Sequence, residues 1–216
     1  MARPKTPLIS RRNTLEVALE IVDEEGLDAL SIRRLATELN VNGASLYHHF
    51  ANKDDILAGV AQLALADVRT PTDVDADWRV WLLKNVLGYR HALKEHPHLI
   101  PVLVKRHPLR IGLAEHNASA ALLAVKGVPH GAILPLLEAL EQLAIGSVLY
   151  ESAVELDEHP EVWKDRYPHL YELGQQAALD QDAIFEVMAK AIIDAIVDAV
   201  DAKPALVGSS GGRSRR

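Results

Sequence analysis

The sequence predicts an all-α protein, in which a three-helix helix-turn-helix domain precedes a larger helical domain. Between residues 30 and 39, apolar side chains recur three and four positions apart, which is the spacing of one helix face. From Trp78 onward almost every readable stretch shows the same period. No stretch shows the alternation of apolar and polar residues that predicts a strand.

The first helix is bounded by residues that start and stop helices. Residues 1–9 contain two prolines and are expected to form a flexible arm. A helix is then expected from Ser10 or Asn13 to Glu25, with Gly26 as its C-terminal stop.

Two short helices and a tight bend are expected within residues 30–57. Ser31 is an N-cap candidate for the first of them, and Asn40 suits a left-handed bend. Three apolar residues match the spacing of a helix-turn-helix: Ala36, Val41 and Leu46. The second helix, about Gly43 to His49, would then enter the major groove of DNA. The alternative is an ordinary helical hairpin in an all-α core.

A longer helix is expected from about Lys53 to Val68, with Asn52 as its cap. The polar, proline-containing stretch 69–77 follows it. We expect the boundary between the two domains near this stretch.

Residues 10–60 resemble the DNA-binding domain of the TetR family of transcription regulators. The stretches RRNTLEVALEIVDEEG and LSIRRLATELNV carry the resemblance, and the family signature continues at five positions: Leu46, Tyr47, His49, Phe50 and Lys53. The resemblance implies that ten residues lie against double-stranded operator DNA, chiefly against its phosphates: Ser31, Arg33, Arg34, Gly43, Ala44, Ser45, Tyr47, His48, His49 and Lys53.

Two features of this stretch affect which DNA bases it would contact. Many members of the family carry longer side chains where this chain has Gly43 and Ala44. These two residues can contribute only a close approach or contact with a thymine methyl group. Arg33 is the best candidate to reach a base edge, because its guanidinium can bond guanine in a bidentate way.

The second domain is predicted to be a series of helices, some of them interrupted. The expected stretches are Trp78 to Leu93, short pieces over 96–110, Ile111 to Val125, His130 to Val154, an irregular 155–179, and Asp182 to Ala202. The expected organisation is therefore an arm (1–9), a DNA-binding domain with its connecting helix (10–68), an effector-binding and dimerisation domain (77–203) and a disordered tail (204–216).

Asn85 lies among aromatic and apolar residues on one face of its predicted helix. Its amide needs a hydrogen-bond partner, either elsewhere in the core or in a bound small molecule. Asp77 to Leu93 also resembles the tetracycline repressors, in which an Asn and an aromatic residue one turn later touch the drug; Asn85 and Tyr89 match them. We expect a cavity for a mostly apolar effector, walled by Trp81, Asn85, Tyr89, Leu103, His107, Asn117 and Tyr150.

No metal or cofactor is expected. Glu95 and His98 have the spacing of a metal-binding pair, but Pro97 between them interrupts the helix that would aim both inward. Where the tetracycline repressors carry the His and the Glu of their magnesium site, this chain has Leu103 and Tyr150. A magnesium–tetracycline effector is therefore not expected.

Two helices, Ile133 to Tyr150 and Ile184 to Val200, carry more apolar surface than one bundle needs. A helix-turn-helix protein that binds the two halves of a palindromic DNA site also needs two-fold symmetry. We therefore expect a homodimer, with a four-helix interface that includes Leu140, Ala144, Val148, Ala191 and Ala195.

The charge of the chain is unevenly distributed. The net charge is −7, yet residues 1–53 hold seven basic and seven acidic residues, so the remainder carries the whole excess. Basic residues gather in the arm and the helix-turn-helix, which is enough to attract phosphates. The chain has no cysteine, which excludes disulfides and thiolate metal sites. No signal peptide or membrane-spanning run is apparent, so we expect a cytoplasmic protein with no membrane partner.

These observations favour a ligand-responsive DNA-binding regulator, most simply a repressor that binds a palindromic operator as a dimer and is released by its effector. The alternative is a helical small-molecule-binding protein or enzyme whose cavity is the primary function. Against an enzyme, no nucleophile–base pair or paired carboxylates share a helix face, and no Gly-rich phosphate loop or HExxH motif occurs.

Overall fold

The computed structural model describes residues 10–66, 77–106, 111–154 and 164–202, and every regular element in these ranges is a helix. The elements are α1 (Arg11–Glu25), α2 (Ile32–Glu38), α3 (Gly43–Leu46), α4 (Lys53–Ala64), α5 (Trp78–Glu95), η1 (Pro97–Leu99), α6 (Ile100–Arg106), α7 (Leu113–Val125), α8 (His130–Val154), α10 (Pro168–Gln175) and α11 (Gln181–Asp201). The all-α prediction is confirmed. The expected arm, the expected boundary at 69–76 and the expected tail lie outside the described residues.

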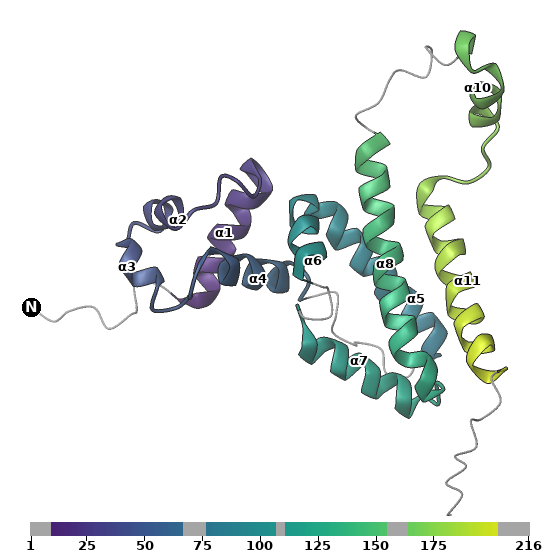
Figure 1. Cartoon of the computed structure of the whole chain (residues 1–216), viewed down its shortest axis with the longest axis horizontal. Coiled ribbons are helices and arrows are strands. Elements are labelled where there is room, and N and C mark those ends of the chain that lie inside the picture. Colours follow the sequence, from purple (N-terminus) through teal and green to yellow (C-terminus); the bar gives the residue numbers. More distant parts are fainter. Residues whose placement is uncertain (1–9, 67–76, 107–110, 155–163, 203–216) are drawn as a thin grey trace, which may run out of the picture.

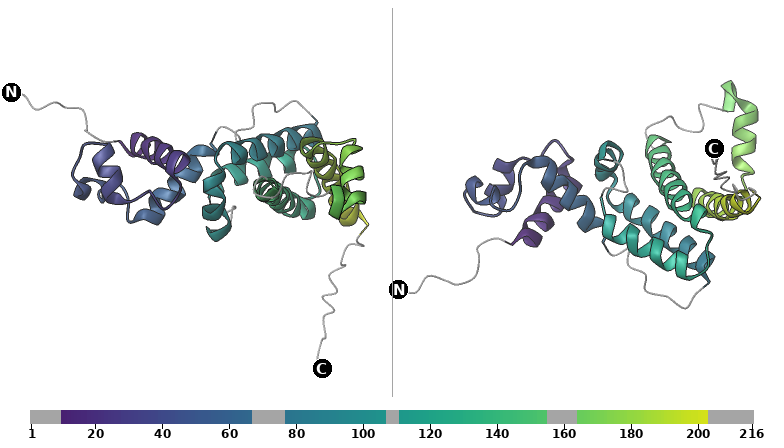
Figure 2. Two further views of the ribbon diagram at one scale, coloured as in Figure 1. Left: turned by 90° about the horizontal axis from the view of Figure 1, so that it is seen from above. Right: turned by 60° about the horizontal axis from the view of Figure 1, so that its bottom comes forward.

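The helices form two groups. Figure 1 shows α1 to α4 at one end of the molecule and the helices from α5 onward at the other, and both views of Figure 2 show the same separation. In the larger group, α8 packs against α5, α7 and α11, which makes it the central helix. Between the groups, α4 contacts α6 and α1 contacts η1.

Helix α1 begins at a side-chain cap and ends at a glycine. The Ser10 side chain accepts a hydrogen bond from the Asn13 backbone N–H at 3.1 Å, so Ser10 is the N-cap. Gly26 ends the helix with φ 84°, a left-handed conformation that favours glycine. Of the two starts that the sequence left open, the structure has the earlier one.

The bend of the helix-turn-helix is a helix C-cap built around Asn40, whose φ is 51°. The Asn40 N–H donates to the Thr37 carbonyl at 3.0 Å, and the Val41 N–H donates to the Ala36 carbonyl at 2.9 Å. These two bonds form a Schellman motif, which ends α2 and directs the chain into α3. The expectation that Asn40 takes a left-handed conformation is confirmed.

Replacing Asn40 with valine is expected to lower the free energy of unfolding by about 1–2 kcal/mol, because a β-branched residue is strained in the left-handed region. Glycine at the same position is expected to be neutral or stabilising. Urea unfolding of both variants measures the difference. A valine variant as stable as the glycine variant would show that the backbone conformation at this bend does not limit stability.

Helix α8 is long and apolar. Its segment His130–Ser152, with a mean hydropathy of 1.6, is long and apolar enough to cross a membrane by length and composition. A buried core helix passes the same test, and α8 packs on three other helices of the chain. The packing identifies it as the core of the second helical group.

Candidate DNA-binding surface and effector cavity

Helices α2 and α3 both begin at side-chain caps. The Ser31 hydroxyl accepts a hydrogen bond from the Arg34 N–H at 3.1 Å, and the Asn42 side-chain oxygen accepts one from the Ala44 N–H at 3.0 Å. Each cap satisfies a backbone donor that the helix leaves unpaired. The two caps therefore set where the recognition unit starts, independently of any DNA.

Helix α3 is shorter than the sequence predicted. It ends at Leu46, and Tyr47 to His49 form a turn instead of a further helical turn. The turn is held by the buried Phe50 and by Arg11, whose Nη1 donates to the His49 carbonyl at 2.6 Å. The Arg11 guanidinium also lies 4.5 Å above the Phe50 ring. Arg11 was not among the predicted site residues, because sequence spacing gives no signal for a contact 38 residues away.

Most of the residues expected to meet DNA are accessible. The exposed ones are Ser31, Arg33, Arg34, Ala44, Tyr47, His48 and His49, and the half-buried ones are Gly43, Ser45 and Lys53. Tyr47 is a large aromatic side chain that remains 59% exposed. A partner that covers its ring would relieve this exposure of apolar surface.

The three basic side chains of this set differ in their surroundings. Arg34 pairs with Glu25 at 2.8 Å and with Glu38 at 2.9 Å. Arg33 forms no ion pair with any residue in the described part of the chain, and its side chain is exposed. Of the two neighbouring arginines, Arg33 is therefore the one whose charge is available to DNA.

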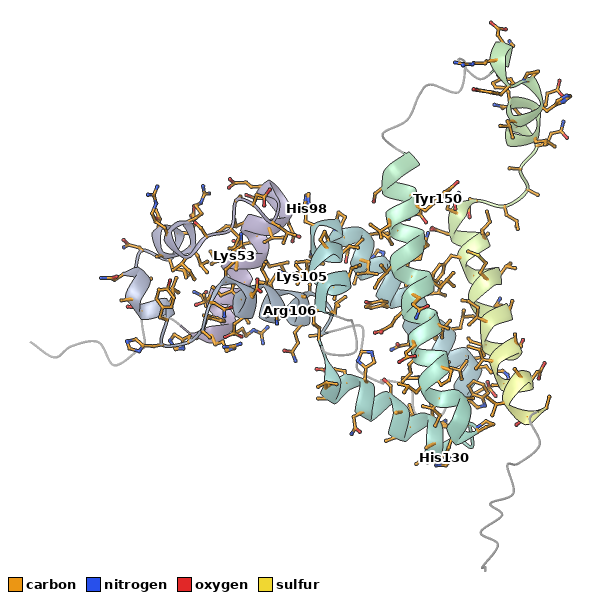
Figure 3. The ribbon with its side chains drawn as sticks, in the orientation of Figure 1. Lys53, His98, Lys105, Arg106, His130 and Tyr150 are labelled. Carbon is orange, nitrogen blue, oxygen red and sulfur yellow. The ribbon has the colours of Figure 1, made fainter. Side chains whose placement is uncertain are left out.

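Lys53 is held by the protein itself. Its Nζ donates to the Leu27 carbonyl at 2.9 Å, and it lines a groove shared with Lys105 and Arg106 of α6. Figure 3 shows Lys53 in the first helical group and Lys105 and Arg106 on the facing part of the second. Lys53 therefore joins the start of α4 to the segment between α1 and α2. Its contact with DNA stays a prediction.

A small cavity of about 40 Å³ lies between α5, α7 and α8. Asn85 and Tyr89 both line it, as the effector hypothesis requires. The residues that surround it are Leu82, Asn85, Val86, Tyr89, Glu115, His116, Ser119, Leu137, Leu140 and Glu141. Pockets for drug-sized molecules are about 300–1,000 Å³, so this cavity must widen before it holds one.

Other residues predicted to wall this cavity lie elsewhere. Trp81 and Leu103 are buried in the hydrophobic core at 5% and 0% exposure and are not among the cavity's lining residues. Asn117 is exposed, and Tyr150 is 64% exposed. Figure 3 shows Tyr150 near one end of α8, whereas α7 lies along the other half of that helix. These four assignments are corrected, and His107 lies outside the described residues.

Three charged or titratable residues of the cavity were missed. His116 lies between two acceptors: its Nδ1 is 2.8 Å from the Gly112 carbonyl, and its Nε2 is 2.6 Å from Glu141 Oε1. Glu115 stands next to it, and the Oε2 atom of Glu115 is buried with no hydrogen-bond partner among the described residues. One signal was available, because Glu141 lies on a mostly apolar helix and a carboxylate that is partly buried there needs a partner.

Arg90, the next residue after Tyr89, joins three helices of the second group. Its side chain is only 5% exposed and donates to Asp182 of α11 at 2.7 Å and to Glu151 and Ser147 of α8. Its guanidinium also lies 4.7 Å from the centre of the Phe185 ring. The buried charge is thus paired on several sides, and the network links a wall of the cavity to the α8–α11 pair.

The network shifts the pKa values of its members. Burial lowers the pKa of Arg90, but hydrogen bonds to Asp182 and Glu151 outweigh this and raise it above its ordinary value. Hydrogen bonds from Arg90 and then Lys94 lower the pKa of Asp182. Stability from Asp182 is therefore present above its unfolded pKa and is lost as the pH falls through the lower folded value. Because the Asp182 side chain is 70% exposed, solvent weakens this contribution.

The cavity helix α5 is connected to the helix-turn-helix unit at its C-terminal end. His96, which follows α5, has its Nδ1 2.9 Å from the Asp23 carboxylate of α1. Nearby, Asp54 at the start of α4 lies 3.6 Å from Arg106 and 3.8 Å from Lys105. Residues at the C-terminal ends of α5 and α6 therefore contact α1 and α4.

The expected dimer interface needs revision for α8. Leu140, Ala144 and Val148 are 2%, 0% and 2% exposed within a single chain, so they belong to its own core. Ala191 and Ala195 of α11 are exposed. The exposed large apolar residues of these two helices are instead Leu134, Leu149, Tyr150, Val187 and Met188. The sequence predicted that α8 is apolar, but the three residues that it assigned to the interface are already buried within the single chain.

Comparisons with known proteins agree with this architecture. A family model described as "Bacterial regulatory proteins, tetR family" matches residues 15–60. An HTH-type transcriptional regulator of Saccharopolyspora erythraea is 30% identical over 175 residues, covering 80% of this chain and 68% of that protein. The class C tetracycline repressor protein of Escherichia coli is 30% identical over 152 residues, covering 69% of each chain.

Solved structures show the same relationship. The Streptomyces coelicolor TetR family protein ActR, in complex with actinorhodin, superimposes with a TM-score of 0.73 at 28% identity, covering 90% of this chain and 99% of that one. These relatives are transcription regulators, not enzymes. The similarity spans both the helix-turn-helix unit and the helices around the cavity, and the chain therefore belongs to the TetR family of transcription regulators.

Proposed function

We propose that this protein is a cytoplasmic repressor that binds a palindromic operator as a homodimer and releases it when a small, mostly apolar effector enters the cavity beside Asn85. The observation that carries the proposal is the connection between two sites. Exposed Arg33 and Tyr47 mark one site, and the cavity marks the other. The contacts of His96 with Asp23 and of Arg106 with Asp54 join them.

Two relatives support the finer parts of this proposal. The class C relative is a tetracycline repressor, which favours repression here. ActR has been solved with the small molecule actinorhodin, which favours a small-molecule effector. An effector acts by binding two conformations with different affinity, and operator DNA must then change effector affinity by the same factor.

A second copy of the chain is proposed to cover the exposed face of α8 and α11. Val187, Ala191 and Ala195 recur at four-residue steps on the side of α11 opposite the buried Phe185 and Ala189. In Figure 1, α8 and α11 run side by side, and α10 stands apart from both. Paired α8 and α11 helices from two chains would bury this face. They would also set the spacing of the two α3 helices, one from each chain, at about 34–36 Å or a multiple of it.

Arg33→Ala and Tyr47→Ala are expected to weaken binding to a DNA duplex that the wild-type protein selects from a random pool. Loss of a bidentate base contact by Arg33 costs about 1–3 kcal/mol, which is roughly a five- to 150-fold drop in affinity at its base position. Loss of Tyr47 should weaken binding on all sequences alike. Fluorescence anisotropy at two salt concentrations measures both effects, together with the steep salt dependence that phosphate contacts require.

Lys190→Ala provides the control, because Lys190 is an exposed cation of α11 that pairs with Glu186 at 2.6 Å. It removes the same charge from the far group of helices and should leave DNA affinity unchanged. The proposed DNA surface is wrong if Arg33→Ala and Tyr47→Ala both bind the selected duplex as tightly as the wild-type protein.

A further inference from the structure

The cavity between α5, α7 and α8 has two chemically distinct halves. Leu82 and Val86 of α5 and Leu137 of α8 give an apolar wall. Glu115 and His116 of α7 and Glu141 of α8 give a wall that carries two carboxylates and one imidazole. A ligand that fills both halves must combine an apolar body with a group that suits the charged wall.

Within the described residues, the two carboxylates of this wall differ in their hydrogen bonding. Glu141 is bonded to His116 at 2.6 Å. Glu115 retains a buried oxygen, Oε2, with no hydrogen-bond partner among the described residues. A buried carboxylate oxygen without a donor is costly, and a donor that arrives with the ligand removes that cost.

Helix α7 is the wall best able to move. It is 13 residues long, yet Ser119 and Leu123 are its only fully buried side chains. Leu113 and Val125, near its two ends, are 65% and 87% exposed. The bond between His116 and Glu141 fastens this helix to α8 over the cavity. Few buried contacts make local opening inexpensive, so α7 can separate from α8 and enlarge the space beside Glu115.

We propose that the effector carries a protonated amine or a similar cationic N–H group, which donates to Glu115 while its apolar body lies against Leu82, Val86 and Leu137. This inference rests on the proposed effector function and specifies the chemistry of the effector. A neutral hydroxyl of the same shape can donate a hydrogen bond to the carboxylate, but it brings no positive charge to balance the buried negative charge. Glu115 is therefore the residue that selects a cationic ligand.

The test uses three probes that share one aromatic body: 1-naphthylmethylamine, 1-naphthalenemethanol and 1-naphthoic acid. They present a cation, a neutral hydroxyl and an anion, and binding is measured by calorimetry on the full chain. The amine is expected to bind roughly ten- to a hundredfold more tightly than the alcohol, with the acid weakest, because only the ammonium group both donates to the buried carboxylate and balances its charge. Glu115→Gln should abolish the preference for the amine.

Glu138→Gln is the matched control, since Glu138 is a half-buried acid of α8 that is not among the lining residues of the cavity. It should leave the preference intact. Equal binding of amine and alcohol to the wild-type protein overturns the proposal, as does a preference that survives Glu115→Gln, or no binding of the amine at millimolar concentration. If Glu115→Gln fails to fold, the comparison of probes on the wild-type protein decides alone.

DNA binding is measured in parallel, so that the two proposals fail separately. A wild-type protein that binds its selected duplex but shows no preference for the amine contradicts only the choice of effector chemistry. A protein that prefers the amine but binds no DNA with steep salt dependence contradicts the repressor function. When both hold, the amine is also expected to weaken DNA binding, and the duplex to weaken binding of the amine by the same factor.

Discussion

Arg90→Ala is expected to lower the free energy of unfolding by about 3 kcal/mol, because it removes the cation of a buried network and leaves its acidic partners in place. The side chain is 5% exposed and bonds Asp182, Glu151 and Ser147. Alanine would also leave a space beside Phe185, over which the guanidinium lies. Urea unfolding at a fixed protein concentration measures the loss, since dimerisation would make the apparent stability concentration-dependent.

Arg79→Ala is the matched control. Arg79 lies on the same helix α5 and also pairs with α11, at 3.2 Å from Asp194, but its side chain is 46% exposed. Exposed ion pairs contribute about 0–1 kcal/mol, so this variant should stay close to the wild-type protein. The explanation by burial fails if the two arginine variants are equally stable.

Removing both members of the buried pair separates charge from packing. In Arg90→Ala the Glu151 carboxylate keeps Lys94, at 3.2 Å, as its remaining cation. The double variant Arg90→Ala/Glu151→Ala is expected to be less destabilised than the sum of the single variants, because neither charge is then left without its partner. Additive losses would instead indicate that the Arg90–Glu151 pair has no coupling energy of its own.

Ala191→Glu is expected to convert a dimer into monomers and to reduce affinity for the selected duplex by two orders of magnitude or more. Two-fold symmetry would place the new carboxylate in the interface twice, and burial of an unpaired charge costs several kcal/mol. Because Ala191 is exposed in the single chain, the protomer itself should remain folded. Sedimentation velocity and helix content by circular dichroism measure assembly and folding separately.

Ala121→Glu makes the same change on an exposed alanine of α7, away from the proposed interface. This control should remain dimeric and bind DNA normally. An Ala191→Glu protein that sediments as a dimer would remove α11 from the interface. A wild-type protein that is monomeric at micromolar concentration would remove the dimer altogether.

The helix-turn-helix could be predicted from the sequence in some detail, because its determinants are local. Ser10, Ser31 and Asn52 each cap the helix that follows within three residues, and Asn40 closes α2 by bonds that span four and six residues. Such contacts depend on the order of residues and little else. The same locality explains why Asn85 and Tyr89, one turn apart on α5, were correctly placed on a shared face toward a cavity.

Which face of α8 is buried could not be predicted, because this helix is apolar on almost every side and its period selects no direction. Packing against α5, α7 and α11 decides it: Leu140 turns inward and Tyr150 outward. Arg90 finds its partners 57 to 92 residues away, and His116 meets Glu141 25 residues away. The sequence by itself determined that the described part of the chain is helical and where α1, α2 and α4 begin. Only the tertiary structure decided which charges meet, because the energy of a buried charge depends on neighbours that chain folding brings together from distant positions.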